Sequence, residues 1–251
     1  MGHYSIHFSP TGGTRRVADI LIEGLQVEYQ QIDLCHEIDN INLNDGDVCL
    51  VSVPSYGGRV PAIAIDRLKK VTGNGAKAIL NCVYGNRAWE DTLTELQDTL
   101  ESQEFICVAA LATVAEHSIF RQYATGRPDE IDKAELIEMA AKIQNRLNTG
   151  FNGKLELEGS HGTYKVFGGT PLKPVGNEDC SGCGLCAREC PVGAIDVADP
   201  KNPILDKCIS CMRCIGICPK GARNVDQDLW GMMAEKMAPV LGGRKENHLF
   251  L

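Results

Sequence analysis

The cysteines of this chain are concentrated in one repeated motif. Eight of the 12 cysteines follow the pattern C-x2-C-x2-C-x3-C-P, first at residues 180–191 and again at residues 208–219. Three thiolates spaced in this way hold three irons of a cubic cluster, and the fourth iron needs a thiolate from elsewhere in the chain. In a doubled motif, the fourth cysteine of each repeat serves the other repeat. The sequence therefore predicts two [4Fe-4S] clusters with crossed ligands.

Crossing assigns four cysteines to each cluster. Two zinc sites would need only pairs of C-x2-C, so the third cysteine and the trailing proline are surplus to them. A disulfide framework implies an oxidising compartment, yet the chain opens MGHYSIHFSP, without a charged and then apolar leader pattern. The predicted ligands are Cys180, Cys183, Cys186 and Cys218 for cluster 1, and Cys208, Cys211, Cys214 and Cys190 for cluster 2.

Residues 176–225 resemble the bacterial two-cluster ferredoxin in every cysteine spacing and in both trailing prolines. The resemblance implies a small α+β domain that carries the two clusters. The four remaining cysteines lie singly in apolar runs, where a free thiol behaves as a small hydrophobic group. We expect them to be buried, and they are Cys35, Cys49, Cys82 and Cys107.

Composition and charge limit the partners. The chain has 251 residues, of which 43% are hydrophobic, and it has no apolar stretch as long as a membrane span. We therefore expect a cytoplasmic protein. The formal charge is −8, and two loaded clusters bring it to about −12. This charge disfavours nucleic acid and anionic membranes and favours redox proteins with basic docking patches.

The first 148 residues alternate between β-prone runs and runs with helical periodicity. Such alternation predicts an α/β fold, with helices on both faces of a doubly wound parallel sheet. Five strands fit the order 2-1-3-4-5, whose ligand site lies at the switch point beyond strands one and three. The predicted strands span residues 4–8, 29–34, 48–53, 76–83 and 105–111, and the predicted helices span residues 14–25, 62–70, 89–100 and 130–147.

The loop after the first strand has the composition of an anion site. It combines two glycines with three hydroxyl side chains and leads directly into a helix, whose N-terminus favours negative charge. It has neither the lysine of a Walker loop nor a G-x-G-x-x-G pattern, and a plain helix-capping turn is the alternative. The loop resembles the flavodoxin phosphate loop, which implies FMN. Its candidate ligands are Ser9, Thr11, Gly12, Gly13 and Thr14.

Two further loops occupy the positions where a flavodoxin holds the flavin ring. In the second loop, Tyr56 is the aromatic residue available to stack on the ring, and in the third loop Asn86 is a candidate partner for its pyrimidine edge. Glycines in both loops allow close approach of the backbone to a flat ligand. The candidates are Pro54, Ser55, Tyr56 and Gly57 in the second loop and Tyr84, Gly85, Asn86 and Arg87 in the third.

A polar trio follows the fifth predicted strand, at the edge of the sheet where α/β proteins bind ligands. It consists of Glu116, His117 and Ser118. Glu116 is a candidate to orient His117, and His117 is expected to titrate near neutral pH beside a flavin. The alternative is a hydrogen-bond network that anchors the loop.

Together the two halves resemble the flavodoxin-ferredoxin fusion proteins of anaerobic bacteria and archaea. The segments GNRAWED, EHS and GRPD also resemble that family. We expect a flavodoxin-like FMN domain at residues 1–148, a partly packed linker at 149–175, a two-cluster domain at 176–225, and a C-terminal helix and tail at 226–251. The apolar stripe of that last helix predicts docking onto the core, with a homodimer or partner contact as the alternative.

The leading hypothesis is a soluble electron-transfer protein that passes electrons between FMN and two [4Fe-4S] clusters. A flavin-dependent reductase of a small acceptor is the alternative, with His117 or Arg87 as proton donor or anion anchor. A redox-sensing module with an empty flavodoxin-like domain is a third hypothesis. The carrier is preferred because the sequence has no recognisable nicotinamide site or second catalytic domain.

Overall fold

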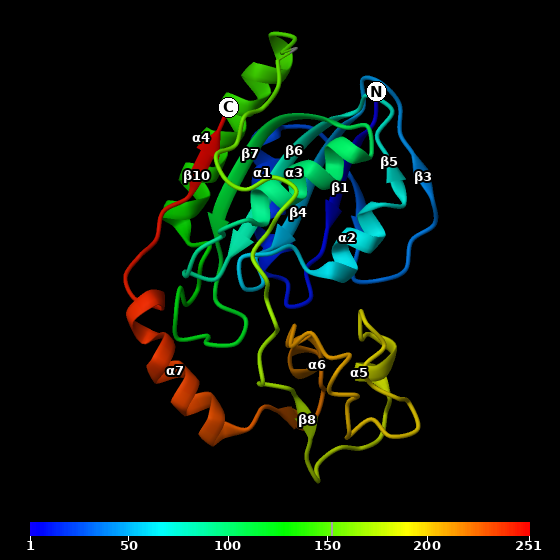
Figure 1. Ribbon diagram of the computed structural model, residues 1–251, viewed down its shortest axis with the longest axis vertical. Coiled ribbons are helices and arrows are strands. Elements are labelled where there is room, and N and C mark those ends of the chain that lie inside the picture. The colour runs from blue at the N-terminus through cyan, green and yellow to red at the C-terminus, as the bar shows by residue number, and fades with distance from the viewer. Residues whose placement is uncertain (152) are drawn as a thin grey trace.

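The computed structural model describes residues 1–151 and 153–251 and is built around a six-stranded sheet (Figure 1). Five strands are parallel to their neighbours, and the sixth, β10, pairs antiparallel with β7 at one edge. The strand order is β10-β7-β6-β4-β1-β2. The strands are β1 (His3–His7), β2 (Gln30–Asp33), β4 (Val48–Pro54), β6 (Lys77–Tyr84), β7 (Ile106–Val114) and β10 (His248–Phe250).

The predicted order 2-1-3-4-5 is confirmed by β2-β1-β4-β6-β7. β4 and β6 are nearly continuous runs of buried residues rather than alternating ones. Strands have this pattern when helices cover both faces of a parallel sheet. The fold is thus a flavodoxin-like doubly wound sheet, extended by one antiparallel strand.

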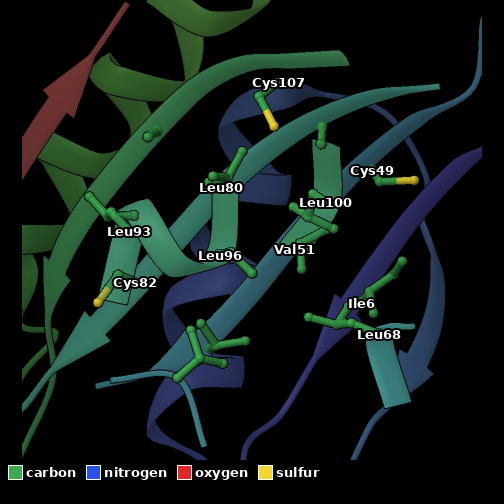
Figure 2. Close-up of a cluster of buried hydrophobic side chains, with 14 of the residues drawn as sticks. Ile6, Cys49, Val51, Leu68, Leu80, Cys82, Leu93, Leu96, Leu100 and Cys107 are labelled. Carbon is green, nitrogen blue, oxygen red and sulfur yellow. The ribbon is translucent and has the colours of Figure 1, made fainter. Parts of the chain in front are cut away.

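Helices cover the sheet on both faces. α1 (Gly13–Leu25) and α4 (Glu130–Asn148) pack against each other over one face, while α2 (Ala62–Leu68) and α3 (Thr92–Ser102) cover the other. Figure 2 shows Leu93, Leu96 and Leu100 of α3 over the strands, beside Leu80 and Cys82 of β6. Two separate apolar cores, one on each face, therefore hold the sheet.

The four cysteines outside the motif lie in or beside the strands and are buried, as predicted: Cys35, Cys49, Cys82 and Cys107. Burial raises the pKa of the Cys35 and Cys49 thiols to about 12. They remain protonated apolar groups at neutral pH.

Smaller elements complete the chain. β3 (Ile41–Asn42) pairs with β5 (Val71–Thr72), and β8 (Val175–Gly176) pairs with β9 (Arg223–Asn224). The two cysteine motifs contain the short helices α5 (Leu185–Arg188) and α6 (Arg213–Gly216), and α7 (Gln227–Leu241) follows them. Figure 1 shows the cysteine region beyond the carboxyl ends of the parallel strands, with α7 leading back to the sheet. No helix in the described part of the chain has the length and apolar character needed to cross a bilayer.

The segment between α4 and β8 forms no regular element in its described residues, but much of it is anchored. Leu155 and Leu157 are buried in the core beneath α3, and Gln97 Nε2 donates to the Leu155 carbonyl at 2.7 Å. Further along, Leu172 is buried with residues of α7. The alternating residues 154–158 thus contribute buried leucines to a core without pairing as a strand.

The C-terminal tail enters the sheet, which the sequence did not predict. The three residues of β10 are too short to show a strand pattern, and they pair beside residues 110–112 of β7. Just before β10, Asn247 donates to Asp132 at 2.9 Å and its Oδ1 accepts from the N–H of Val114 at 2.9 Å. The tail is therefore part of the first domain's architecture.

A buried ionic cluster holds the tail against α4. Asp132 has no exposed surface and accepts from Arg127 Nε at 2.8 Å, from Arg244 Nη2 at 3.1 Å and from Asn247. Asp129 caps α4 and also pairs with Arg244. Arg244 and Asp132 lower the pKa of the Asp129 carboxyl well below its usual range, with the hydrogen bond from Arg244 as the largest cause.

Asp132→Ala tests this cluster. It leaves the buried guanidinium of Arg127 without its carboxylate, so we expect a loss of about 3 to 5 kcal/mol in the free energy of unfolding, measured by denaturant titration with circular dichroism. Glu138→Ala is the control, because it breaks an exposed ion pair with Lys142 on the same helix and should leave stability nearly unchanged. Equal losses in the two variants would contradict the assignment.

Candidate functional site

A cavity of about 360 Å³ lies at the carboxyl edge of the sheet. It is lined by the loops that follow β1, β4, β6 and β7, and also by the linker, a cysteine-motif loop and α7. Of the predicted site residues, the structure brings the following to this cavity: Thr11, Gly13, Thr14, Pro54, Ser55, Tyr56, Gly57, Tyr84, Gly85, Arg87 and His117. Ser9, Gly12 and Asn86 do not line it.

The first loop presents the start of α1 to the cavity. Gly12 is the N-cap with φ 86°, a left-handed conformation that favours glycine, and it has no side chain to cap the helix. Ser9 Oγ accepts from the N–H of Arg15 at 2.9 Å, so Ser9 stabilises the loop instead of facing a ligand. The N–H groups of Gly13 and Thr14 at the first turn are thereby left for an anion in the cavity that both residues line.

The second loop is a tight turn closed by the Tyr56–Arg59 bridge. Ser55 Oγ accepts from Thr92 Oγ1 at 2.9 Å, which ties the loop to α3. Tyr56 lines the cavity, and burial raises the pKa of its hydroxyl well above the ordinary value. Tyr56 is therefore a neutral aromatic side chain at the cavity wall.

The third loop departs from the prediction at Asn86. The side chain is buried, and its Nδ2 donates to the carbonyls of Leu241 at 2.5 Å and Gly243 at 2.7 Å, while its Oδ1 accepts from the N–H of Lys245. Asn86 therefore fixes the end of α7 and is not a partner for a ligand ring. Because those carbonyls come from a segment more than 150 residues away, the local sequence carries no signal for this role.

The aromatic residues of the third loop are also fixed by the tail. Tyr84 donates its hydroxyl to the carbonyl of Glu246 at 2.8 Å, and burial raises its pKa to about 12. Trp89 lies between Tyr84 and His248, with ring centroids 5.3 and 5.1 Å away. Trp89 precedes α3 and packs with the core, so its ring is occupied by protein contacts.

His117 differs from the expectation of a neutral-pH switch. Its Nδ1 accepts from the N–H groups of Ile119 and Phe120, both at 3.1 Å, so the proton of the neutral ring lies on Nε2. Burial, helped by the charge of Arg87, lowers its pKa to about 4. Glu116 does not orient His117, because its carboxylate accepts from Arg121 Nε at 2.6 Å and from the N–H of Gly126.

Arg87 is engaged as well. Its guanidinium forms a two-point pair with Glu90 at 3.0 and 2.7 Å, and Lys165 of the linker donates to the same carboxylate at 2.8 Å. The hydrogen bond from Arg87, more than any other contact, lowers the pKa of Glu90 to about 2. Arg87 is thus a partly neutralised member of an ionic cluster at the rim, not a free anion anchor.

Residues outside the three predicted loops complete the cavity. Phe167 of the linker lies against Gly57, where an added Cβ would meet its ring at 2.2 Å. Met233 and Met237 of α7 line the opposite side, and Trp230 Nε1 holds that helix by donating to the Ile119 carbonyl at 3.0 Å. The helical methionine stripe was the only sequence signal for this docking.

The cysteine region contains two further small cavities. One is lined by Cys180, Cys183, Cys186 and Cys218, and the other by Cys190, Cys208, Cys211 and Cys214. Each thus gathers three cysteines of one repeat and the last cysteine of the other. Within the described residues, no three His, Cys, Asp or Glu side chains converge on one point tightly enough for a single metal ion. A cubic cluster holds its thiolates further apart than a zinc ion does.

Equivalent backbone donors support the two cavities. The N–H of Ala194 donates to Cys190 Sγ, and the N–H of Ala222 donates to Cys218 Sγ, both at 3.3 Å. Such bonds stabilise the anionic thiolate form. Cys183 is the exposed cysteine of its set, whereas burial raises the pKa of the Cys211 thiol to about 12.

Comparison with known proteins identifies the cysteine region. Residues 165–223 match the family described as the 4Fe-4S dicluster domain. The chain is 42% identical over 55 residues to one component of the ion-translocating oxidoreductase complex of Methanosarcina acetivorans, and 44% identical over 52 residues to the polyferredoxin protein MvhB of Methanothermobacter thermautotrophicus. The matched segments make up 22% and 21% of this chain, and 21% and 13% of the length of those relatives.

Solved structures similar to the chain include two flavodoxins. One is from Streptococcus pneumonia TIGR4, with 16% identity, a TM-score of 0.43 and coverage of 60% of this chain and 100% of that one. The other is flavodoxin 2 from Bacillus cereus, with 15% identity, a TM-score of 0.42 and the same coverage. The fold assignment stands on the strand order itself, which is that of a doubly wound flavodoxin-like sheet.

The strand order and the domain match define this chain as a flavodoxin-like α/β domain joined to a 4Fe-4S dicluster domain.

The neutral state of His117 leads to a prediction about pH. Because the lowered pKa of about 4 keeps the ring uncharged, the affinity for FMN, measured by quenching of flavin fluorescence, should change with pH in parallel for the wild type and for His117→Gln. We expect the ratio of the two dissociation constants to stay within about twofold from pH 8 to about 5.5. A change in this ratio near pH 6.5 would show that His117 becomes charged there, which would contradict the assignment.

Proposed function

We propose that the chain is an electron-transfer protein in which FMN fills the cavity at the sheet edge and exchanges electrons with the two clusters of the C-terminal domain. FMN supplies a flavin that takes up one or two electrons, whereas a [4Fe-4S] cluster exchanges one at a time. Such a chain would join one-electron redox partners to two-electron ones. The supporting observation is the thin wall between the cavity and the cysteine set of cluster 2.

That wall is Ile209. This residue lines both the large cavity and the small cavity formed by Cys190, Cys208, Cys211 and Cys214, and the adjacent Ser210 also lines the large one. Both belong to the turn between two cysteines of the second motif. A ligand in the large cavity therefore lies one residue away from cluster 2, a separation that favours direct electron exchange.

The residues of the cavity fit FMN. The N–H groups of Gly13 and Thr14 and the hydroxyl of Thr11 suit the phosphate, because donors at a helix N-terminus bind anions. Tyr56 and Phe167 offer aromatic surface for the flavin ring. His117 adds a neutral ring to the wall, so no cation from this residue stabilises negative charge on a reduced ligand.

The positions of the three cavities also suggest the order in which electrons pass between the cofactors. Ile209 links the large cavity to the cluster 2 set, and among the described residues none that lines the large cavity also lines the cluster 1 set. Cluster 1 instead has the exposed Cys183. We infer the sequence FMN, cluster 2, cluster 1, with redox partners docking at Cys183. The formal charge of −8 favours partners with basic patches.

The carrier is preferred to a reductase because α7 covers part of the cavity. Met233 and Met237 lie at its wall, and a volume of about 360 Å³ is near the lower end of the range for ligand sites. Little space then remains for a second substrate above the ring. Turnover of a small acceptor by the intact holoprotein that is lost in His117→Ala would favour the reductase instead.

An anaerobic redox titration of the reconstituted protein tests the proposal. Iron, sulfide and FMN are counted first, and electrons are then added in steps from a one-electron donor while visible and EPR spectra are recorded. We expect two EPR-active clusters and one flavin per chain, with flavin absorbance bleaching as electrons from the clusters equilibrate with it. Bound flavin that stays oxidised while both clusters are reduced would refute intramolecular transfer.

We expect Gly13→Asp to weaken the binding of FMN without removing the clusters. The new carboxylate would lie among the phosphate donors and raise the FMN dissociation constant by about tenfold to a hundredfold, the value of a charge-assisted hydrogen bond. The fold should tolerate it, since the added Cβ meets only Ala115 at 3.4 Å and Asp is favourable at a helix N-terminus.

Gly231→Asp is the matched control, because it adds the same charge on α7 where a Cβ meets nothing within 4 Å. Both variants should keep the iron content of the wild type. FMN affinity that is unchanged in Gly13→Asp, or reduced equally in the control, would show that the first loop does not hold the phosphate.

A further inference from the structure

Arg223 is a buried cation beside the cysteine sets. It lies on β9, is only 3% exposed, and lines the cavity of cluster 1. Its backbone is fixed by the pairing of β9 with β8, in which Arg223 stands opposite Gly176. The side chain thus starts from a rigid position and extends into the interior of the cysteine region.

The guanidinium contacts a sulfur ligand of cluster 1. Arg223 Nη1 donates to Cys186 Sγ at 3.8 Å. Arg223 therefore lies against the sulfurs of the cluster 1 set, whose cavity it also lines.

The charge of Arg223 has no carboxylate partner in the described part of the chain. Its other contacts are the carbonyls of Pro200 and Pro174, the latter at 2.8 Å from Nη2. Its Nε is buried without a hydrogen-bond partner. A buried cation is costly unless an anion compensates it. A loaded cluster 1, with a net charge of about −2, supplies that anion.

The internal repeat has an uncharged residue at the position that corresponds to Arg223. The first motif ends C-P-V-G-A-I and the second C-P-K-G-A-R, so Arg223 occupies the position of Ile195. Ile195 is buried and lines the cluster 2 cavity. The preceding alanines donate to cysteine sulfur at the same distance of 3.3 Å in both repeats. The backbone is thus equivalent, and a buried aliphatic in one repeat is a buried cation in the other.

We propose that Arg223 is the counter-ion of cluster 1 and raises its reduction potential. Reduction adds one electron to a cluster and takes its net charge from about −2 to about −3, with no proton transferred by Arg223. A cation at the sulfurs stabilises the more negative state. The inference rests on the ligand sets proposed above and is independent of FMN binding.

Arg223→Gln tests the proposal by EPR-monitored redox titration of the full holoprotein. Without the charge, we expect the ratio of reduced to oxidised cluster 1 at a fixed potential to fall about tenfold, a shift of about 59 mV for a one-electron couple. Arg188→Gln is the matched control. It removes the same charge near cluster 1, but this arginine donates to the Cys183 carbonyl in an exposed contact, so water screens it.

The control separates a local from a global charge effect. Unchanged potentials in Arg223→Gln, or equal shifts in Arg223→Gln and Arg188→Gln, would overturn the proposal. Arg223→Lys keeps the charge, and we expect it to recover most of the shift in potential. A shift in Arg223→Lys as large as in Arg223→Gln would also overturn it.

A second measurement uses the unaltered protein and does not depend on the variants folding. With ¹⁵N in the guanidinium groups of arginine, pulsed EPR of the reduced clusters should detect hyperfine coupling to nitrogen, and the coupling should persist in Arg188→Gln. No coupling would overturn the contact with the sulfurs. Fewer than two EPR-active clusters in the wild type would instead refute the ligand sets, and flavin that stays oxidised would refute only the transfer to FMN.

Discussion

The apolar contact between α7 and the carboxyl edge of the sheet is the interaction on which the site depends. Its core consists of Phe120, Leu172, Met212, Val225, Ala234 and Leu241. These residues come from the loop after β7, from the linker, and from the stretch that runs from the second cysteine motif through the turn after β9 into α7. Because their burial is shared, none of these segments can leave without exposing the apolar surface of the others. The cluster domain is therefore held against the sheet by burial and not by a flexible tether.

Polar contacts fix the orientation of that domain. Arg67 of α2 is 5% exposed and donates to the carbonyls of Leu34 at 2.8 Å and Pro191 at 2.9 Å. One buried guanidinium thus joins the sheet domain to Pro191, the last residue of the first cysteine motif. Arg213 of α6 pairs with Glu189 and approaches the Pro10 carbonyl at 3.5 Å, at the start of the phosphate loop. Rigid attachment of this kind keeps the distance between cofactors constant, as electron exchange requires.

The parts of the site that the sequence predicted are those encoded by short-range pattern. Strand and helix alternation specified the strand order, because a parallel sheet covered on both faces leaves a clear signal in each segment. Gly12 and Gly13 marked the turn into α1 for a local reason, the left-handed conformation of Gly12 at the helix start. Asn86 was misjudged because its hydrogen-bond partners, in residues 241–245, lie far from it in sequence. His117 was misjudged because burial in the folded chain lowers its pKa.

The sequence by itself determined the elements that carry the chemistry of this chain: eight cysteines in two motifs, a glycine-rich loop before a helix and an α/β framework. These follow from spacing and composition, which act over a few residues. Only the tertiary structure decided how the parts meet, with Ile209 between the two cofactor sites, α7 over the cavity and β10 in the sheet. It also decided that Arg223 is a buried cation at the cysteine set of cluster 1. Burial and long-range contact set these features, because the charge state and reach of a side chain depend on neighbours that no local pattern specifies.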